Sequence, residues 1–258
     1  MDVTRIPVDT QTRGPGGRTN AYLLGDQRAL LVDPAARSQE LDAAVADATV
    51  TDIAVTHHHH DHVRGVGEYA AETGATVWVR AGRAEAFTSL TGIDPDRTFR
   101  EGTVVETDTG PVEVLATSGH APGHVTFAWD GGAAVGDLAV AEGSVVVGRP
   151  EGDMRAYLTA LRRLHARGFD ALYPGHGPVI EDPRATCERL IDHRLDRERK
   201  VRAAVESGAR TLQEVLDAAY DKDLTGVEDL ARATVACHLE KLAVEGAVTW
   251  DGERAAPA

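Results

Sequence analysis

The stretch from residue 56 to residue 62 reads Thr-His-His-His-His-Asp-His and follows the apolar residues 53–55. A metal ion needs lone-pair donors that converge on one point, and a loop held by a preceding strand supplies them within a few residues. The template His-x-His-x-Asp-His falls on His57, His59, Asp61 and His62. A frame that starts at His58 would use His60 and leave no carboxylate in place, so the first frame is the better one.

Further donors occur downstream in chain order, each beside Gly or Pro near the end of an apolar run. They are His120 and His124 in "TSGHAPGH", Asp137 in "AVGDLA" and His176 in "LYPGHGPVI". Histidine-rich tracts also occur as purification tags or as solvated surface, but tags lie at chain termini and this tract is internal. Donors spread along the chain in this order favour a metal site over a surface cluster.

The residues that must position these donors read as short strands separated by Gly, Asp and Pro. The candidate strands are residues 21–25, 29–33, 52–56, 75–80, 112–117, 124–129 and 133–137. Helical patterns lie between some of them, one beginning at the N-cap candidate Ser38 and another running from Asp153 to the stop Gly168. This alternation predicts an α/β sandwich rather than an all-β domain.

The composition becomes helical and charged from Pro183 onward. One helix is expected to reach about Ser207, a second is capped by Thr211, a third ends near Gly246, and "AVTWDGERAA" fits a closing hairpin. The predicted domains are residues 1–182 and residues 183–258. The second is expected to be a small winged-helix-like α module. Its candidate recognition helix is more acidic than basic, so we expect a lid, a cleft wall or a homodimer surface rather than a DNA reader.

Length and charge limit the function classes. A chain of 258 residues with 42% hydrophobic residues can bury a sizeable core. The net charge of −14 argues against an extended basic surface for nucleic acid, although bound metal ions can supply positive charge to a nuclease. Cys187 and Cys237 give no disulfide framework. Without an apolar span or signal-peptide pattern, we predict a cytoplasmic protein with no membrane partner.

The motifs "THHHHDH", "GHAPGH", "AVGD" and "PGHG" together resemble the ligand motifs of the metallo-β-lactamase superfamily over about the first 180 residues. The resemblance implies an αββα sandwich of two β-sheets with the site at one edge. It implies one metal ion held by His57, His59 and His120, a second held by Asp61, His62 and His176, and a bridging Asp137. By the same resemblance, His124 supports the site rather than binding metal.

Imidazole and carboxylate donors without cysteine suit Zn²⁺, and also Fe or Mn, so two zinc ions are the expected cofactors. A pair of ions lowers the pKa of a bridging water to about 7. The resulting hydroxide would attack a carbonyl carbon or a phosphorus, while the second ion stabilises the developing charge. Asp61, which would orient the nucleophile as well as bind metal, and Asp137 are the expected catalytic residues.

Within the superfamily, Asp61 and Asp137, together with "TNAYLLG" and "DHRLDRE" (192–198), resemble the glyoxalase II-like branch and the lactamase-β-like branch with a C-terminal winged helix. The resemblance implies hydrolysis of a thioester or other acyl substrate, as in hydroxyacylglutathione hydrolase. The alternative is an endoribonuclease acting on single-stranded RNA, which an aromatic content of 5% and the negative charge disfavour. A third interpretation is a metal-binding or regulatory protein without turnover.

Two residue roles stay open at this point. Asn20 either donates an amide near the site or is a turn or strand-edge residue. His193 and Arg194 either contact an anionic substrate or lie on a solvated helix face. The segment 184–202 carries seven basic and four acidic residues, which favours the solvated face.

Overall fold

The computed structural model of the chain describes residues 1–221 and 223–258 and has a mixed α/β architecture. Its contacts divide the chain into two compact units. Unit 1 comprises residues 1–117, 123–145 and 167–186, and unit 2 comprises residues 118–122, 146–166 and 187–258. Two segments of unit 2 precede residue 183, and the division into domains at that residue stays a prediction.

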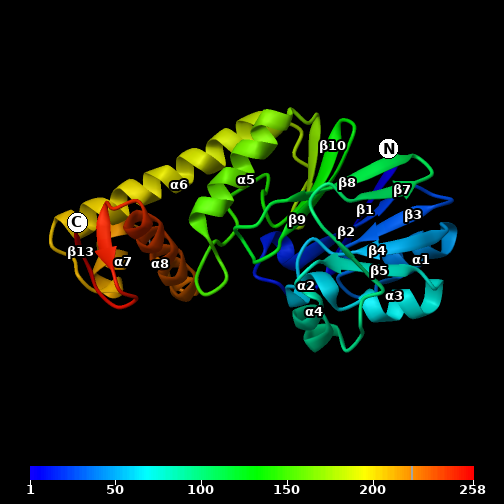
Figure 1. Cartoon of the computed structure of the whole chain (residues 1–258), viewed down its shortest axis with the longest axis horizontal. Coiled ribbons are helices and arrows are strands. Elements are labelled where there is room, and N and C mark those ends of the chain that lie inside the picture. Colours follow the sequence, from blue (N-terminus) through cyan, green and yellow to red (C-terminus); the bar gives the residue numbers. More distant parts are fainter. Residues whose placement is uncertain (222) are drawn as a thin grey trace. The chain divides into compact units, whose positions relative to one another are not determined.

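Unit 1 contains two β-sheets, in which all seven predicted strands occur (Figure 1). The first sheet has the order β1 (Val3–Asp9), β2 (Arg18–Leu24), β3 (Ala29–Val32), β4 (Val50–Ala54), β5 (Thr76–Arg80), β6 (Arg97–Phe99). The second has the order β11 (Ala171–Pro174), β10 (Gly132–Gly136), β9 (Val125–Trp129), β8 (Gly110–Ala116), β7 (Val104–Thr107). A short 3-10 helix, η1 (Pro15–Gly17), lies between β1 and β2.

The helices of unit 1 are α1 (Gln39–Asp47), α2 (His60–Val63), α3 (Val66–Thr73) and α4 (Ala84–Thr91). The predicted cap of α1 is confirmed, since the hydroxyl of Ser38 accepts a hydrogen bond from the backbone N–H of Leu41 at 3.1 Å. α3 and α4 carry no side-chain cap and were not predicted. Both end at a glycine in the left-handed region, Gly74 and Gly92.

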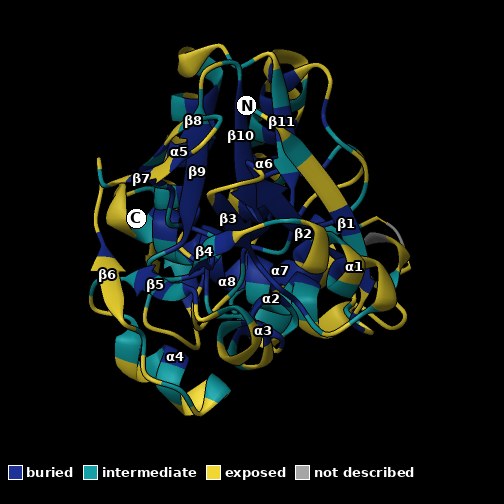
Figure 2. Cartoon of the chain, turned by 90° about the vertical axis from the view of Figure 1, so that its right-hand side faces the viewer, coloured by how far each residue is buried: buried dark blue, intermediate teal, exposed yellow. Residues whose placement is uncertain are grey.

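Apolar side chains fill two layers of unit 1. Between the sheets, Tyr22 and Leu30 of the first sheet belong to the same buried cluster as Phe127 of the second. On the other face of the first sheet, Ile53 of β4 and Leu41 of α1 belong to a second buried cluster. Each fully buried side chain of this size contributes about 1.5–3 kcal/mol. Figure 2 shows the result: β3, β9 and β10 are buried, whereas β6 is largely exposed.

Strands β3 to β6 run parallel to one another, and so do β10 and β11. The carboxyl ends of parallel strands lie at one edge of a sheet, where ligands bind in α/β proteins. Asp33 follows β3, the histidine-rich segment follows β4, Asp137 follows β10 and His176 follows β11. The topology therefore gathers residues that are far apart in sequence.

Unit 2 contains α7 (Leu212–Ala219), α8 (Glu228–Val244) and the antiparallel strands β12 (Val248–Trp250) and β13 (Ala255–Pro257). It also contains all of α5 (Met154–Arg167) except its last residue, and α6 (Pro183–Glu206) from residue 187 onward. Thr211 and Glu214 form a capping box at the start of α7, which confirms the prediction that Thr211 caps this helix. Val205 of α6, Leu216 of α7 and Leu239 of α8 share one buried core. Three helices and a hairpin are thus present, and their assignment as a winged helix stays a prediction.

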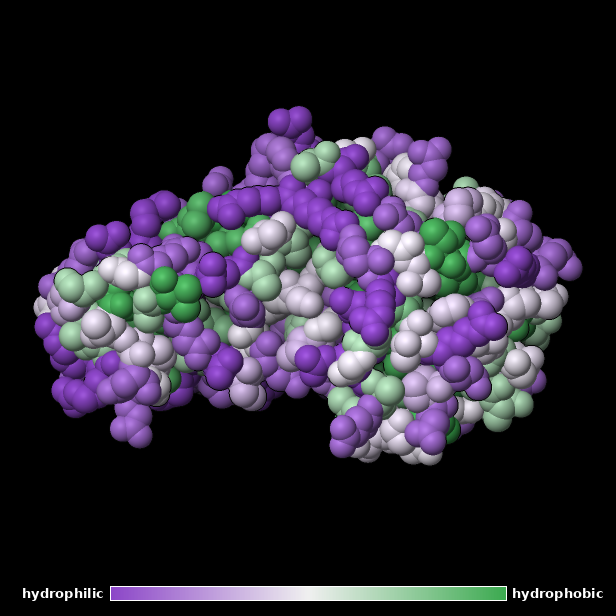
Figure 3. Space-filling view, viewed as in Figure 1, coloured by the Kyte–Doolittle hydropathy of each residue, from purple (hydrophilic) through white to green (hydrophobic). Residues whose placement is uncertain are grey.

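The longest helix, α6, is strongly polar. Hydrophilic side chains predominate along it on the face shown in Figure 3. Among the described residues, no helix has the length and the apolar character that crossing a membrane requires.

Candidate metal centre

The histidine-rich segment follows β4 and leads directly into α2. His62 donates its backbone N–H to the carbonyl of His59 at 2.9 Å, so the chain turns back on itself within the motif. His57 and His62 are buried, whereas His60 is exposed. Burial therefore distinguishes these two proposed ligands from the spacer His60.

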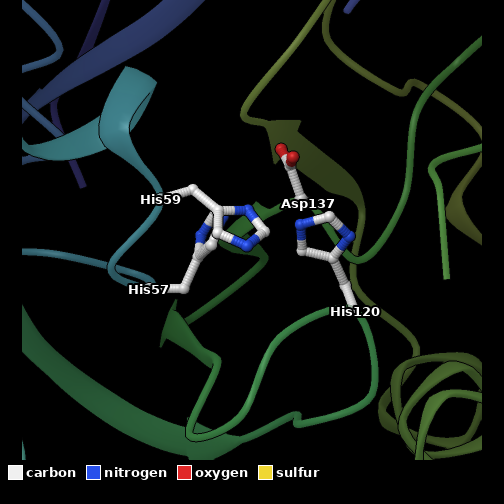
Figure 4. Close-up of side chains that lie close together, drawn as sticks. All are labelled: His57, His59, His120 and Asp137. Carbon is white, nitrogen blue, oxygen red and sulfur yellow. The ribbon is translucent and has the colours of Figure 1, made fainter. Parts of the chain in front are cut away.

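One group of donors combines this segment with two distant residues. It consists of His57, His59, His120 and Asp137, whose ligand atoms all lie within 4.8 Å of one another. Figure 4 shows the rings of His57 and His59 close together, with the side chains of His120 and Asp137 next to them. Three imidazoles and a carboxylate at such a spacing suit a divalent transition-metal ion.

A second group consists of Asp61, His62 and His176, again with ligand atoms within 4.8 Å of one another. Asp137 reaches this group as well. Its Oδ1 atom lies 3.3 Å from Nε2 of His176 and 3.5 Å from Nε2 of His62. The carboxylate of Asp137 thus lies within reach of both groups, which is the position a bridging ligand requires.

The other ring nitrogen of these histidines is engaged elsewhere. Nδ1 of His176 donates to the carbonyl of Arg18 at 2.7 Å, and Nδ1 of His120 donates to the carbonyl of Val146 at 2.6 Å. Such bonds fix the tautomer and leave Nε2 as the metal-binding atom. Nε2 of His62 is buried without a hydrogen-bond partner in the described chain, as expected of a metal-binding atom. The donor set therefore fits metal ions.

Asp33 is a site residue that the sequence analysis missed. It is 1% exposed and stands at the end of β3 with a φ of +50°. Its Oδ2 atom accepts from Nδ1 of His62 at 2.8 Å and from the hydroxyl of Thr56 at 2.7 Å. That hydroxyl in turn accepts from Nδ1 of His57 at 3.0 Å. One carboxylate therefore orients both histidines, directly or through Thr56.

Asn20 supports the segment that carries His176. It is 1% exposed, and its side-chain amide donates to the carbonyls of Pro174 at 2.8 Å and Gly177 at 2.9 Å, on either side of that histidine. Of the two roles left open for Asn20, an amide donor near the site is therefore correct, and it acts on the backbone.

The loop between β1 and β2 also contacts the second group. A methyl group on Gly14 would come within 2.8 Å of Cγ of His176, so only glycine leaves room for the imidazole at this position. The hydroxyl of Thr12 hydrogen-bonds the carboxylate of Asp61. The loop thus packs against both residues and limits how far they can move.

Both ring nitrogens of His124 have protein partners that do not belong to the candidate ligand set or are backbone groups. Nδ1 lies 3.0 Å from the hydroxyl of Thr117, and Nε2 accepts the backbone N–H of Asp137 at 3.1 Å. The expectation that His124 supports the site is consistent with this geometry, because it fixes the backbone that carries Asp137.

The electrostatics of the site follow from its burial and mixed charges. Burial lowers the pKa of His62 and of His176. For His62 the carboxylates of Asp137 and Asp33 together outweigh burial and raise the pKa, and for His176 the carboxylate of Asp137 and the hydrogen bond to Arg18 do so. Burial raises the pKa of Asp137, yet the same two imidazoles hold that pKa well below its usual range. Burial also raises the pKa of Asp61, but the imidazole of His62 and the hydroxyl of Thr12 outweigh burial and lower that pKa. The site therefore keeps its carboxylates ionised.

The helix segment 192–198 departs from its prediction. His193 is exposed, but Arg194 is only 3% exposed and its guanidinium lies 5.4 Å from the ring centroid of Tyr157. The solvated-face interpretation is therefore wrong for Arg194, because cation–π contact and burial in unit 2 remove its charge from solvent.

The seven proposed ligands are therefore brought together in two groups that share Asp137. A family model described as "Metallo-beta-lactamase superfamily" matches residues 14–176. The beta-lactamase-like protein 2 homolog of Drosophila melanogaster is 31% identical over 247 residues, 88% of this chain and 83% of that protein. The atrochrysone carboxyl ACP thioesterase of Aspergillus fumigatus is 28% identical over 209 residues, 78% and 64% of the two chains.

A hydroxyacylglutathione hydrolase of Fuscovulum blasticum is 36% identical over 129 residues, 48% of this chain and 49% of that protein. Among solved structures, a metallo-beta-lactamase family protein of Thermus thermophilus has a TM-score of 0.80 at 24% identity and covers 99% of this chain and 98% of its own. Another, described as a di-iron-bound form, has a TM-score of 0.53 at 28% identity over 67% of this chain and 93% of its own.

Proposed function

Since the chain belongs to the metallo-β-lactamase superfamily, we propose that it is a dinuclear metal-dependent hydrolase of a thioester or another acyl substrate. The observation that carries the proposal is the position of Asp137. This residue belongs to the group of His57, His59 and His120, and its Oδ1 also lies 3.3 Å from His176 of the other group. A carboxylate shared in this way supports two ions rather than one.

The reaction consumes one water: the carbonyl–sulfur bond breaks, a carbonyl–oxygen bond forms, and an acid and a thiol leave. Bound metal ions would supply Lewis acidity toward the water and the carbonyl oxygen. The chain's own part is positioning. Asp61, whose carboxylate stays ionised beside His62 and the Thr12 hydroxyl, can accept a hydrogen bond from the attacking water and so orient it. Asp33 and Asn20 hold the surrounding histidines in place.

Zinc is the proposed metal, because imidazole and carboxylate donors without a thiolate suit it. The same donors accept iron or manganese, and a structural neighbour is a di-iron-bound form. Metal identity therefore has to be measured together with activity.

Acyl substrates are supported by two relatives, one named as an ACP thioesterase and one as a hydroxyacylglutathione hydrolase. Single-stranded RNA is the competing substrate. Two basic residues of α8 are occupied within unit 2: Arg232 bonds Gln213 and Glu228, and Lys241 pairs with Glu198 at 2.7 Å. Basic side chains that are already paired bind phosphates poorly, which favours the acyl substrate.

The test is a substrate panel on protein of known metal content. Purified protein loaded with zinc, iron or manganese is incubated with acyl-glutathione and acyl-N-acetylcysteamine thioesters and with an unstructured oligoribonucleotide. Thioester turnover that Asp137→Ala abolishes supports the proposal. Cleavage of the oligoribonucleotide that Asp137→Ala abolishes would instead support the nuclease function. Bound metal with no turnover on any substrate supports the metal-binding interpretation.

A further inference from the structure

Two arginines lie close together at the carboxyl end of β5. Arg80 ends the strand, and Arg83 immediately precedes α4. The backbone N–H of Arg83 donates to the carbonyl of Arg80 at 2.9 Å, which closes the turn between them. Both side chains contact Gly123: a methyl group on that glycine would come within 2.9 Å of Cγ and 3.1 Å of Nε of Arg83, and 3.3 Å of Cγ of Arg80.

This pair lies beside the candidate metal centre. Gly123 directly precedes His124, whose ring centroid lies 5.1 Å from that of His57 and whose Nε2 accepts the N–H of Asp137. β5 pairs in parallel with β4, which leads into the histidine-rich segment, so both carboxyl ends lie at one edge. Figure 1 also shows α4 beside α2, the helix that contains Asp61 and His62.

Among the described residues, no carboxylate balances the charge of the pair. Nη1 of Arg80 donates to the carbonyl of Phe99 at 3.4 Å, and in the part of the chain that the structure describes neither Arg80 nor Arg83 forms an ion pair with Asp or Glu. Elsewhere arginines do pair, as Arg202 does with Glu206 at 2.8 Å. Two neighbouring positive charges without a counter-ion repel each other. The missing counter-ion is notable because the chain has 41 acidic residues and only 27 basic ones.

We propose that Arg80 and Arg83 form an anion subsite that binds a carboxylate or phosphate group of the substrate while its acyl carbon lies at the metal centre. Guanidinium groups donate in pairs to the oxygens of either anion, and binding one would neutralise the repulsion between the two arginines. This inference rests on the proposed hydrolase function and narrows its substrates to acyl compounds that carry a negative charge near the reacting carbonyl.

The test compares a charged and a neutral thioester, S-succinyl- and S-butyryl-N-acetylcysteamine, on zinc-loaded protein. The wild type is expected to prefer the succinyl compound in kcat/KM by about tenfold or more, the range of a charge-assisted hydrogen bond. The double variant Arg80→Gln, Arg83→Gln should lower that ratio about tenfold, mainly by raising KM for the succinyl compound. Arg28→Gln is the matched control. Arg28 is exposed on the turn before β3, at the amino end of that strand, whereas the candidate metal centre lies at the carboxyl end.

Direct titration separates failure of the subsite from failure of the proposed function. Succinate and inorganic phosphate are titrated into the same zinc-loaded proteins by calorimetry. If neither thioester is hydrolysed, the acyl-hydrolase function fails, yet a tenfold weaker anion affinity in the double variant still supports the subsite. Tighter succinate or tighter phosphate binding identifies the source of the anion. Equal affinities and equal kcat/KM ratios in wild type and double variant would overturn the subsite.

Discussion

The candidate metal centre and a polar cluster between α6 and α8 in unit 2 both place carboxylates beside buried imidazoles, but they balance the negative charge differently. In unit 2, the carboxylate of Glu198 lies 2.7 Å from the ammonium of Lys241 and 3.4 Å from Nδ1 of His238, and Lys241 also pairs with Glu245 at 2.8 Å. We call these four residues the α6–α8 cluster. Its positive charge is a lysine that stays protonated at neutral pH.

In the metal centre, the carboxylates of Asp33, Asp61 and Asp137 face imidazoles. An imidazole carries positive charge only when it binds a proton. Metal ions and protons therefore compete for the same atoms, and metal binding must release protons. Under the proposed function, the difference separates a cluster whose charges are balanced by its own lysine from one that bound metal ions would balance.

The sharpest way to break this comparison is to remove the shared carboxylate. Asp137→Ala should reduce bound metal from about two equivalents to one or less and lower kcat/KM by about a thousandfold, because Lewis-acid activation is worth several kcal/mol. Metal is measured by plasma mass spectrometry and turnover with the best thioester. Removal of a carboxylate in the α6–α8 cluster, Glu198→Gln, should leave metal content unchanged. Full metal content in Asp137→Ala would show that Asp137 does not bridge.

A smaller effect is expected from Asp33→Asn. The amide keeps the shape of the side chain but weakens its bonds to His62 and to the Thr56 hydroxyl. Loss of such a supporting partner typically lowers metal affinity about 10–100-fold. Competition with a chromogenic chelator measures the affinity, and Asp26→Asn, at an exposed turn, is the control. An affinity equal to that of the wild type would mean that Asp33 serves folding alone.

Asp33 also shows where the sequence stops being informative. The seven proposed ligands were found because their types and spacing are written in short local motifs. An aspartate that ends an apolar strand is typical of any turn. Its role arises only when β3 pairs in parallel with β4, which brings the carboxylate to the backbone N–H of Thr56 at 2.7 Å. Tertiary pairing, rather than local pattern, makes it a site residue.

The α6–α8 cluster predicts a pH dependence of stability. Burial lowers the pKa of His238, so the unfolded chain takes up a proton below about 6.5 before the folded chain does, and stability falls there. Burial raises the pKa of Glu198, but bonds from His238 and Lys241 outweigh it and lower that pKa, so its contribution is present above 4.5 and lost as pH falls through the folded value.

The measurement is urea unfolding of metal-free protein from pH 7 to pH 4. Glu198→Gln should lower the free energy of unfolding by about 1–3 kcal/mol at pH 7, because the buried Lys241 and His238 lose a charged, mostly buried partner side chain. The difference in the free energy of unfolding between variant and wild type should narrow below pH 4.5, because the wild-type carboxylate then takes up a proton. Glu206→Gln, which affects an exposed pair on the same helix, should change stability by less than about 0.5 kcal/mol. A gap that stays constant with pH would contradict the assignment.

The smallest expected effect concerns the register of the histidine-rich segment. His60 is exposed and belongs to neither group of donors, whereas its neighbour His59 belongs to the first. His60→Ala should keep the full metal content and kcat/KM within about twofold of wild type, as surface substitutions usually do. His59→Ala should lose metal. The reverse result would show that the chain uses the other frame.

The fold was predicted unevenly, for physical reasons. Strands with continuous apolar runs, such as β3 and β4, and helices with clear caps, such as α1 and α7, were identified. The short strands β6 (RTF) and β7 (VVET) contain only one and two apolar residues, too few to form a recognisable apolar run, and α3 and α4 begin without a capping side chain. Sheet pairing and packing against the apolar layer determine these elements, and a local pattern does not contain that information.

The most direct test of the metal centre is the metal content of purified protein before and after reconstitution. The chain is purified without an affinity tag that binds metal, dialysed, and analysed by plasma mass spectrometry alone and after incubation with Zn²⁺, Fe²⁺ or Mn²⁺. The geometry predicts about two equivalents per chain, as in paired metal sites. A chain that carries no transition metal and takes up none would contradict the central claim.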